Sequence, residues 1–157
     1  MNRIAEYTID HSRLDWPALL DCWTWLVPRD AVVLIMNRFG DLFVELQDGS
    51  VHMLDVGRGS FEQVAASRHQ FTRLLDEPGN AADWLMIPLV DALCAAGITL
   101  AEGQCYTYRQ LPVLGGGYAI DNVNRVSIQR HYRAVGPIHE KIEDLPDGTR
   151  ISFDTEG

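Results

Sequence analysis

The sequence predicts a single α+β domain in which helices pack against a largely antiparallel sheet. Segments with strand-like alternation or β-branched runs stand beside segments of helical period. No repeat or low-complexity linker divides the 157 residues. A chain of this length buries about 68–70% of its unfolded surface, so a core forms without a disulfide or metal. Residues 1–157 are therefore expected to form one domain.

The first expected element is a helix over residues 15–27. Asp15 is a candidate N-cap, Pro17 stands in the first turn, and Pro28 ends the segment. Apolar residues recur between them at helical spacing. At least two of the three tryptophans in this region are expected in the core, namely among Trp16, Trp23 and Trp25.

Two strand signals follow. Residues 31–36, AVVLIM, predict a central strand buried on both faces. Residues 41–56 predict a hairpin with Asp48-Gly49 as a two-residue turn. That turn pairs Glu45 with His52 on the polar face, where a cross-strand polar pair is commoner than a catalytic dyad. The core face would carry Leu42, Val44, Leu46, Val51 and Met53.

Helical signals dominate the next 40 residues. Ser60 and Gln63 match a capping box, which predicts a helix from Ser60 to about Leu75. A second helix is expected from Asn80 to just before Gly97, with Pro88 causing a kink or a division into two short helices. Residues 84–90 are apolar on every side, which predicts burial of most of this stretch.

The remaining chain predicts strands over residues 104–111 and 123–135, a short helix over 137–145, and a turn into a final strand over 145–153. The three consecutive glycines of LPVLGGGYAIDN, residues 111–122, raise the question of a phosphate loop. Such loops need Lys and Ser or Thr at fixed places, or a helix that begins directly after the glycines. Neither follows here, so a tight structural bend is expected.

Charge and composition limit the function. The net charge of −9 disfavours binding to nucleic acid or anionic lipid. The longest apolar run is too short for the roughly 20 residues of a membrane span. The N-terminus lacks an apolar signal core, so the protein is expected in the cytoplasm. The three cysteines have no CxxC spacing and are expected to be free, buried thiols: Cys22, Cys94 and Cys105.

Two sets of side chains are candidates for catalysis. In HEKIE, residues 139–143, His139 and Glu143 could form a weak metal pair, but a solvated helix face is favoured. His131 could act as base to Cys105 with Asp121 orienting it, although no nucleophile signature supports this. The chain is therefore expected to be non-catalytic and to need no cofactor, with a small metal-dependent hydrolase using His131 and His139 as an alternative.

Several motifs together resemble the C-terminal domain of type VI secretion immunity proteins. The resemblance covers about residues 31–151, and its most specific parts are GQCY (103–106), LGG (114–116), His131 and IHEKI (138–142). The segment FGDLF (39–43) resembles the end of the GAD-like domain that precedes this region in longer members. The resemblance implies an immunity protein that guards bacteria against a secreted DNase toxin, and it favours a structural role for the glycine run.

That implied function agrees with the distribution of charge. A nuclease active site binds phosphates and is positively charged, so an acidic protein could occlude it. Six acids and two bases lie between His139 and Gly157. The residues expected to bind a basic toxin are Glu140, Glu143, Asp144 and Asp147, with Tyr106 and Tyr108 as aromatic anchors if exposed. A protein-binding or scaffold domain with another partner is the main alternative.

Overall fold

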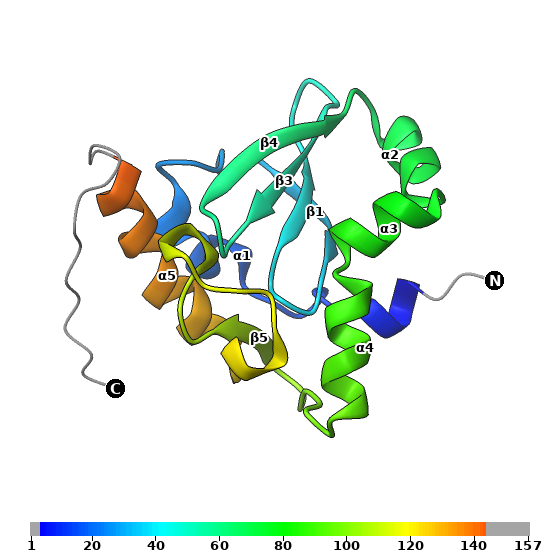
Figure 1. Cartoon of the computed structure of the whole chain (residues 1–157). Coiled ribbons are helices and arrows are strands. Elements are labelled where there is room, and N and C mark those ends of the chain that lie inside the picture. The colour runs from blue at the N-terminus through cyan, green and yellow to red at the C-terminus, as the bar shows by residue number, and fades with distance from the viewer. Residues whose placement is uncertain (1–3, 144–157) are drawn as a thin grey trace.

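The computed structural model describes residues 4–143 and confirms the α+β class. Four antiparallel strands form a sheet in the order β1-β2-β3-β4, and β5 and β6 form a second, two-stranded antiparallel sheet. Helices cover both faces of the larger sheet: α2 to α4 lie on one side and α5 on the other (Figure 1). The strand bounds are Val32–Met36, Leu42–Glu45, Val51–Asp55, Ser60–Ala65, Gln104–Tyr108 and Val123–Ser127.

The N-terminal segment is less helical than predicted. A short 3-10 helix, η1, spans Ile4–Tyr7, and the expected 15–27 helix is reduced to α1 (Trp16–Leu19) and η2 (Asp21–Trp23). The predicted cap is present, because the Asp15 carboxylate accepts from the Ala18 amide at 3.2 Å. Trp23 is fully buried, while Trp16 and Trp25 pack against the same core, so the expected core role is confirmed.

β1 is an edge strand, not the central strand predicted. A bulge lies between Val33 and Ile35, and Val32 is 52% exposed. Its free edge meets the N-terminal segment at one point, where Thr8 pairs with Asn37. A continuous apolar run therefore indicated a strand but did not determine its place in the sheet.

The β2–β3 hairpin forms, but its register differs from the predicted one by one residue. Val44 pairs with His52, and Glu45 pairs with Val51. The loop is longer than two residues, because Leu46 bonds to Ser50 and Gly49 adopts a positive φ of 87°. A three-residue loop that ends in such a glycine is a common hairpin form. Because one residue of slip reverses every side chain, Glu45 and His52 lie on opposite faces and form no dyad.

Both faces of this sheet contribute side chains to a core. The face with Leu42, Val44 and Leu54 belongs to a core shared with α1, η2 and α5. The opposite face, with Phe43 and Val51, belongs to a second core under α2–α4. The predicted separation of one apolar face from one polar face is therefore wrong for this hairpin.

Residues 60–65 form strand β4, where a helix was predicted. The spacing of Phe61, Val64 and Ala65 fits a helix, but pairing with β3 decides the outcome. The helix α2 spans Arg68–Leu75 and begins after a different cap. Ser67 accepts from the Gln70 amide at 3.1 Å, and Gln70 Oε1 accepts from the Ala66 amide at 2.6 Å.

The second predicted helix is divided in two, as Pro88 indicated. α3 spans Pro78–Trp84 and α4 spans Ile87–Ala95, with Gly97 at a positive φ after the end. Met86 lies between them in the left-handed region, at φ 53° and ψ 43°. Leu85 and Val90 are buried and Pro88 is exposed, while the other residues of 84–90 are partly buried, so most of the surface of this stretch is buried, as predicted.

The C-terminal elements differ most from prediction. The strand β6 ends at Ser127, and α5 spans Ile128–Glu143 and includes Gly136 and Pro137. Its buried residues recur at helical spacing once histidine is counted with the apolar residues: Ile128, His131, Tyr132, Val135, Gly136 and His139. The predicted final strand, residues 145–153, lies outside the described residues. Between β5 and β6 the chain forms the short 3-10 helices η3 (Pro112–Leu114) and η4 (Ile120–Asn122).

Gly136 lies inside α5, at a point where this helix packs closely against the N-terminal region. Gly136 lies against the N-terminal region, where an added Cβ would come within 2.8 Å of the Cys22 carbonyl oxygen and 3.0 Å of Trp23 Nε1. The indole of Trp23 donates to the Tyr132 carbonyl at 3.2 Å. Glycine at this position therefore lets α5 approach η2 closely.

Candidate functional site: a cleft between the sheet and the α3–α4 junction

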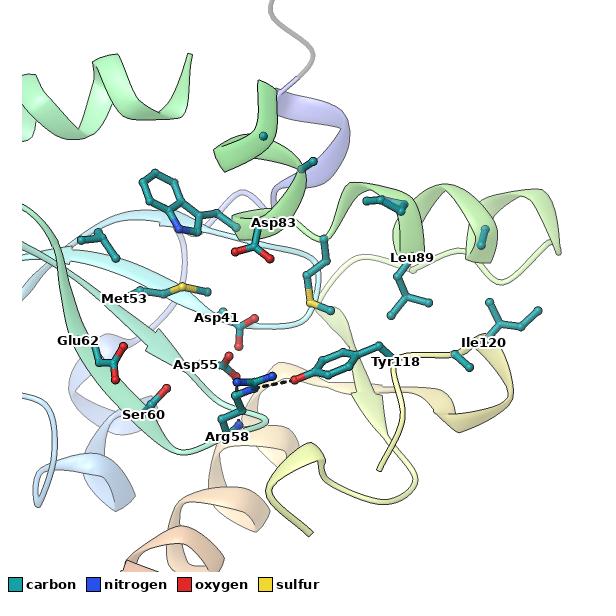
Figure 2. Close-up of a pocket in the computed structure, with 18 residues that line it drawn as sticks. Asp41, Met53, Asp55, Arg58, Ser60, Glu62, Asp83, Leu89, Tyr118 and Ile120 are labelled. Carbon is teal, nitrogen blue, oxygen red and sulfur yellow. Dashed lines mark hydrogen bonds between the residues drawn. The ribbon is translucent and has the colours of Figure 1, made fainter. Parts of the chain in front are cut away.

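A cleft of about 1000 Å³ lies between three parts of the fold (Figure 2). One wall is the α2–α4 side of β3 and β4. The second wall is the α3–α4 junction, and the third is the segment after the glycine run. The lining residues are Asp41, Met53, Asp55, Arg58, Ser60, Glu62, Val64, Gly79, Ala82, Asp83, Trp84, Met86, Pro88, Leu89, Ala92, Tyr118, Ala119 and Ile120.

Asp41 lines the cleft, and hydrogen bonds hold its carboxylate in place. Its carboxylate accepts from Asn37 Nδ2 at 3.0 Å and from the Val56 amide at 2.8 Å. Asn37 Nδ2 also donates to the Trp84 carbonyl at 2.9 Å, which ties the β1–β2 turn to the end of α3. Burial, and then the neighbouring charge of Asp55, hold the pKa of Asp41 well above its ordinary value.

Asp55 lies at the end of β3, close to Asp41, because the hairpin register pairs Leu42 with Leu54. Its carboxylate accepts from the Arg58 amide at 3.1 Å. Burial raises the pKa of Asp55, while Arg58 opposes the increase. Two acidic side chains therefore lie close together at the open end of one hairpin, and Arg58 interacts with one of them, Asp55.

Arg58 connects the sheet to the glycine-containing loop. Its Nε donates to the Tyr118 hydroxyl at 2.8 Å, and its guanidinium lies 5.7 Å from the centroid of the Tyr118 ring (Figure 2). Tyr118 also meets Tyr108 edge to face, with ring centroids 5.7 Å apart. The loop is therefore positioned beside the acidic residues by a cation and two aromatic rings.

The apolar wall comes from the junction of α3 and α4. Trp84 packs on Phe43 and Phe71, with ring centroids 5.5 and 5.7 Å away. Met86 and Leu89 continue this wall and are only partly buried. A non-glycine residue in the left-handed region is uncommon, and at Met86 it separates the two helices and shapes the wall. The apolar character of residues 84–90 thus reflects the lining of a cleft as well as a core.

The glycine run forms a bend, as expected, and no phosphate loop. Gly115 has a φ of 95°, and the Gly116 amide donates to the Leu111 carbonyl at 3.0 Å. The Asn122 amide nitrogen Nδ2 donates to the carbonyls of Gln110 and Gly117, at 2.9 and 2.8 Å. These bonds close the loop on itself and place Tyr118 and Ile120 beside the cleft.

The predicted partner-binding acids that the structure describes do not line this cleft. Glu140 and Glu143 are exposed at the end of α5, while Asp144 and Asp147 lie outside the described residues. Tyr106 is only 1% exposed, and its hydroxyl donates to the Ile98 carbonyl at 2.6 Å, so it does not meet the condition for an aromatic anchor. Tyr108 is half-buried, and its hydroxyl lies 3.5 Å from Met86 Sδ.

The two candidate catalytic histidines, His131 and His139, are both buried. His139 is buried with Nε2 2.6 Å from the Val56 carbonyl, so it is not on the solvated face expected for it. His131 lies in α5 and not at a strand end, and burial lowers its pKa to about 4. His131 and Cys105 both lie near Gly40, whereas Asp121 is exposed on η4. No group of three or more potential metal ligands occurs within residues 4–143.

The thiols are only partly as predicted. Cys22, Cys94 and Cys105 are free, but only Cys105 is buried, and Cys94 is exposed on α4. Burial raises the pKa of the Cys105 thiol, which keeps it protonated near neutral pH.

Sequence reasoning did not find the cleft. Its acidic residues are scattered over the chain, from Asp41 to Asp83, and no spacing rule joins them. One usable signal existed, because Asp41 and Asp55 flank the predicted hairpin and a hairpin brings its two ends together. The contribution of Glu62 was hidden by the incorrect helix over residues 60–75.

Comparison with known proteins finds a similarity over part of the chain. A family model described as T6SS immunity protein Tdi1, C-terminal, matches residues 65–139. No curated protein and no solved structure matches the chain significantly. The match begins at the end of β4 and continues into α5, so it includes the α3–α4 wall and the glycine loop of the cleft. Residues 65–139 are therefore similar to the family described as T6SS immunity protein Tdi1, C-terminal.

Proposed function

We propose that this chain is a non-catalytic immunity protein that binds and neutralises a cognate bacterial toxin, a nuclease, in the cytoplasm. The family match over residues 65–139 is the observation that carries the proposal. The net charge of −9 supports it, because an enzyme that cleaves nucleic acid must attract phosphates and presents a basic surface. Charge complementarity of this kind accelerates association by about 10- to 1000-fold.

Among residues 4–143 the structure contains no helix that could span a membrane. Part of the acidic surface proposed to bind the partner is exposed. The acids Glu140 and Glu143 are exposed at the end of α5 and so are free to approach a partner. They remain the partner surface proposed from the sequence, together with Asp144 and Asp147.

Co-expression tests the function directly. The chain is expressed in bacteria with the candidate toxin encoded beside it, and survival is counted with and without the chain. Survival that depends on the chain, together with co-purification of the two proteins, supports the proposal. A toxin that kills equally in both cases would reject neutralisation of that toxin.

The acidic residues proposed from the sequence are tested separately. Reversal of Glu140, Glu143, Asp144 and Asp147 to Lys should weaken toxin binding and protection if these residues form the contact. If protection by this variant equals that of the wild type, these four acids do not form the binding site, while the immunity function itself stands.

A further inference from the structure

The cleft between β3–β4 and the α3–α4 junction has an unbalanced charge. Among the described residues that line it, four carry carboxylates and Arg58 alone is basic. Two of them, Glu62 and Asp83, are exposed near its opening, and Asp41 and Asp55 lie deeper. Figure 2 shows these groups around one hollow. A cation that entered the hollow would therefore meet acidic groups contributed by four separate segments of the chain.

The walls of the cleft favour a cation that has an apolar stem. Trp84, Met86 and Leu89 provide one apolar side, and Met53 and Val64 provide another. Arginine and lysine side chains bury their methylene groups against such surfaces while the charged group reaches a polar region. Methionine adapts its shape to different partners, which suits Met53 and Met86 to a binding surface.

The rim of the cleft points to a protein and not to a small free cation. Tyr118 is 43% and Ile120 is 41% exposed, and they are among the most exposed large hydrophobic side chains of the described residues. The loop that carries them is fixed by the Arg58–Tyr118 bond and by Asn122. Exposed apolar side chains beside a charged hollow are typical of protein-binding sites, where apolar contacts surround a buried anchor.

We propose that this cleft is a docking site for a basic segment of a partner protein, whose arginine or lysine side chain enters between the α3–α4 wall and the carboxylates. The identity of that partner as a toxin rests on the proposed function. The anchor stem lies against Trp84 and Leu89, and its charged group lies near Asp55 and Asp83. Burial raises the pKa values of Asp41 and Asp55, and a bound cation favours the ionised form of each carboxyl group.

A pair of variants with equal charge change tests the site. Glu62→Lys with Asp83→Lys reverses two exposed acids of the cleft. Asp30→Lys with Asp76→Lys changes the net charge equally, at exposed positions outside the cleft. Affinity for a catalytically inactive toxin is measured by calorimetry, and survival by co-expression. The cleft variant should bind at least tenfold more weakly and lose protection, while the control should stay within about threefold of wild type.

An Ile120→Ser variant tests the rim without a change of charge and should weaken binding severalfold. If the wild type binds and the cleft variant binds equally well, the docking site is overturned while the immunity function stands. If the chain associates with itself and Glu62→Lys with Asp83→Lys abolishes that association, a second copy occupies the cleft and the proposal is also overturned.

A probe that needs no toxin distinguishes failure of the docking site from failure of the proposed immunity function. N-acetyl-arginine amide at millimolar concentration is added to the labelled protein, and NMR shifts of the Trp84 indole and of cleft amides are followed. We expect shifts confined to the cleft, absent with N-acetyl-glutamine amide and absent in the Glu62→Lys, Asp83→Lys variant. An arginine probe that leaves the Trp84 signal unchanged would overturn the site even if no toxin were found.

Discussion

Arg58 Nε donates a hydrogen bond of 2.8 Å to the hydroxyl of Tyr118, 60 residues further along the chain. The bond joins the turn after β3 to the loop that follows the glycine run, and both residues line the cleft. Neither residue is marked by a sequence motif. The contact depends on the bend at Gly115–Gly117, which places the loop beside the sheet, and on Gly59, whose φ of 68° forms the turn before β4.

Removal of the Tyr118 hydroxyl should loosen the loop with little effect on stability. Tyr118→Phe keeps the ring beside the guanidinium and removes only the hydrogen-bond acceptor. Because the bond is exposed, the free energy of unfolding should fall by less than about 1 kcal/mol. Hydrogen exchange should become faster at the Asn122 amide, which bonds to Ala119, and stay unchanged in β2 and β3. Equal exchange in both proteins would show that the bond does not hold the loop.

Adjacent glycines in the run should respond differently to alanine. A Cβ on Gly116 would collide with the backbone carbonyl of Gln110, whereas a Cβ on Gly117 would meet nothing within 4 Å. Gly116→Ala should therefore cost about 1–3 kcal/mol of unfolding free energy, as overpacking does. Gly117→Ala should be neutral or slightly stabilising. Chemical denaturation of both variants measures this, and equal effects would contradict the packing described for the loop.

Stability should fall in acid because of His131. Burial lowers its folded pKa from 6.5 to about 4, so the unfolded chain binds more protons between these values. His131 therefore makes its full contribution to the free energy of unfolding above pH 6.5, and this contribution is lost as the pH falls toward 4. It amounts to roughly 3 kcal/mol, at 1.36 kcal/mol for each pKa unit.

The pH effect of His131 must be separated from that of other groups. Burial also lowers the pKa of His139, while the raised pKa values of Asp41 and Asp55 act in the opposite direction. Urea denaturation from pH 4 to 7 should therefore compare the wild type with His131→Gln, whose stability should change less over this range. His52→Gln on the sheet serves as the control and should follow the wild type. If the free energy of unfolding of His131→Gln changed with pH as much as that of the wild type, the proposed role of His131 in acid sensitivity would be refuted.

The thiols should differ in reactivity. Cys94 is exposed and should react rapidly with a thiol reagent at pH 8, whereas Cys105 is buried with a raised pKa and should react only after unfolding. Labelling followed by mass spectrometry of peptides measures both sites in one experiment. A Cys94→Ser variant identifies the fast phase, and rapid labelling of Cys105 in the folded protein would contradict its burial.

The sequence by itself determined the α+β class, the hairpin, the Asp15 cap, the division at Pro88 and the structural role of the glycine run. These features depend on local causes: hydrophobic period, capping side chains, the missing amide of proline and the freedom of glycine. The family resemblance also came from contiguous motifs, and the match over residues 65–139 confirms it.

Tertiary structure alone decided the rest. The apolar residues of segment 60–65 have helical spacing, but the segment forms a strand because it pairs with β3. The long helix α5 was hidden because Gly136 and Pro137 resemble breakers and because the buried His131 and His139 were counted as polar. The cleft required that same sheet, the turn at Met86 and the glycine loop to come together. Its acidic groups lie in four segments of the chain, and only long-range packing places them around one hollow.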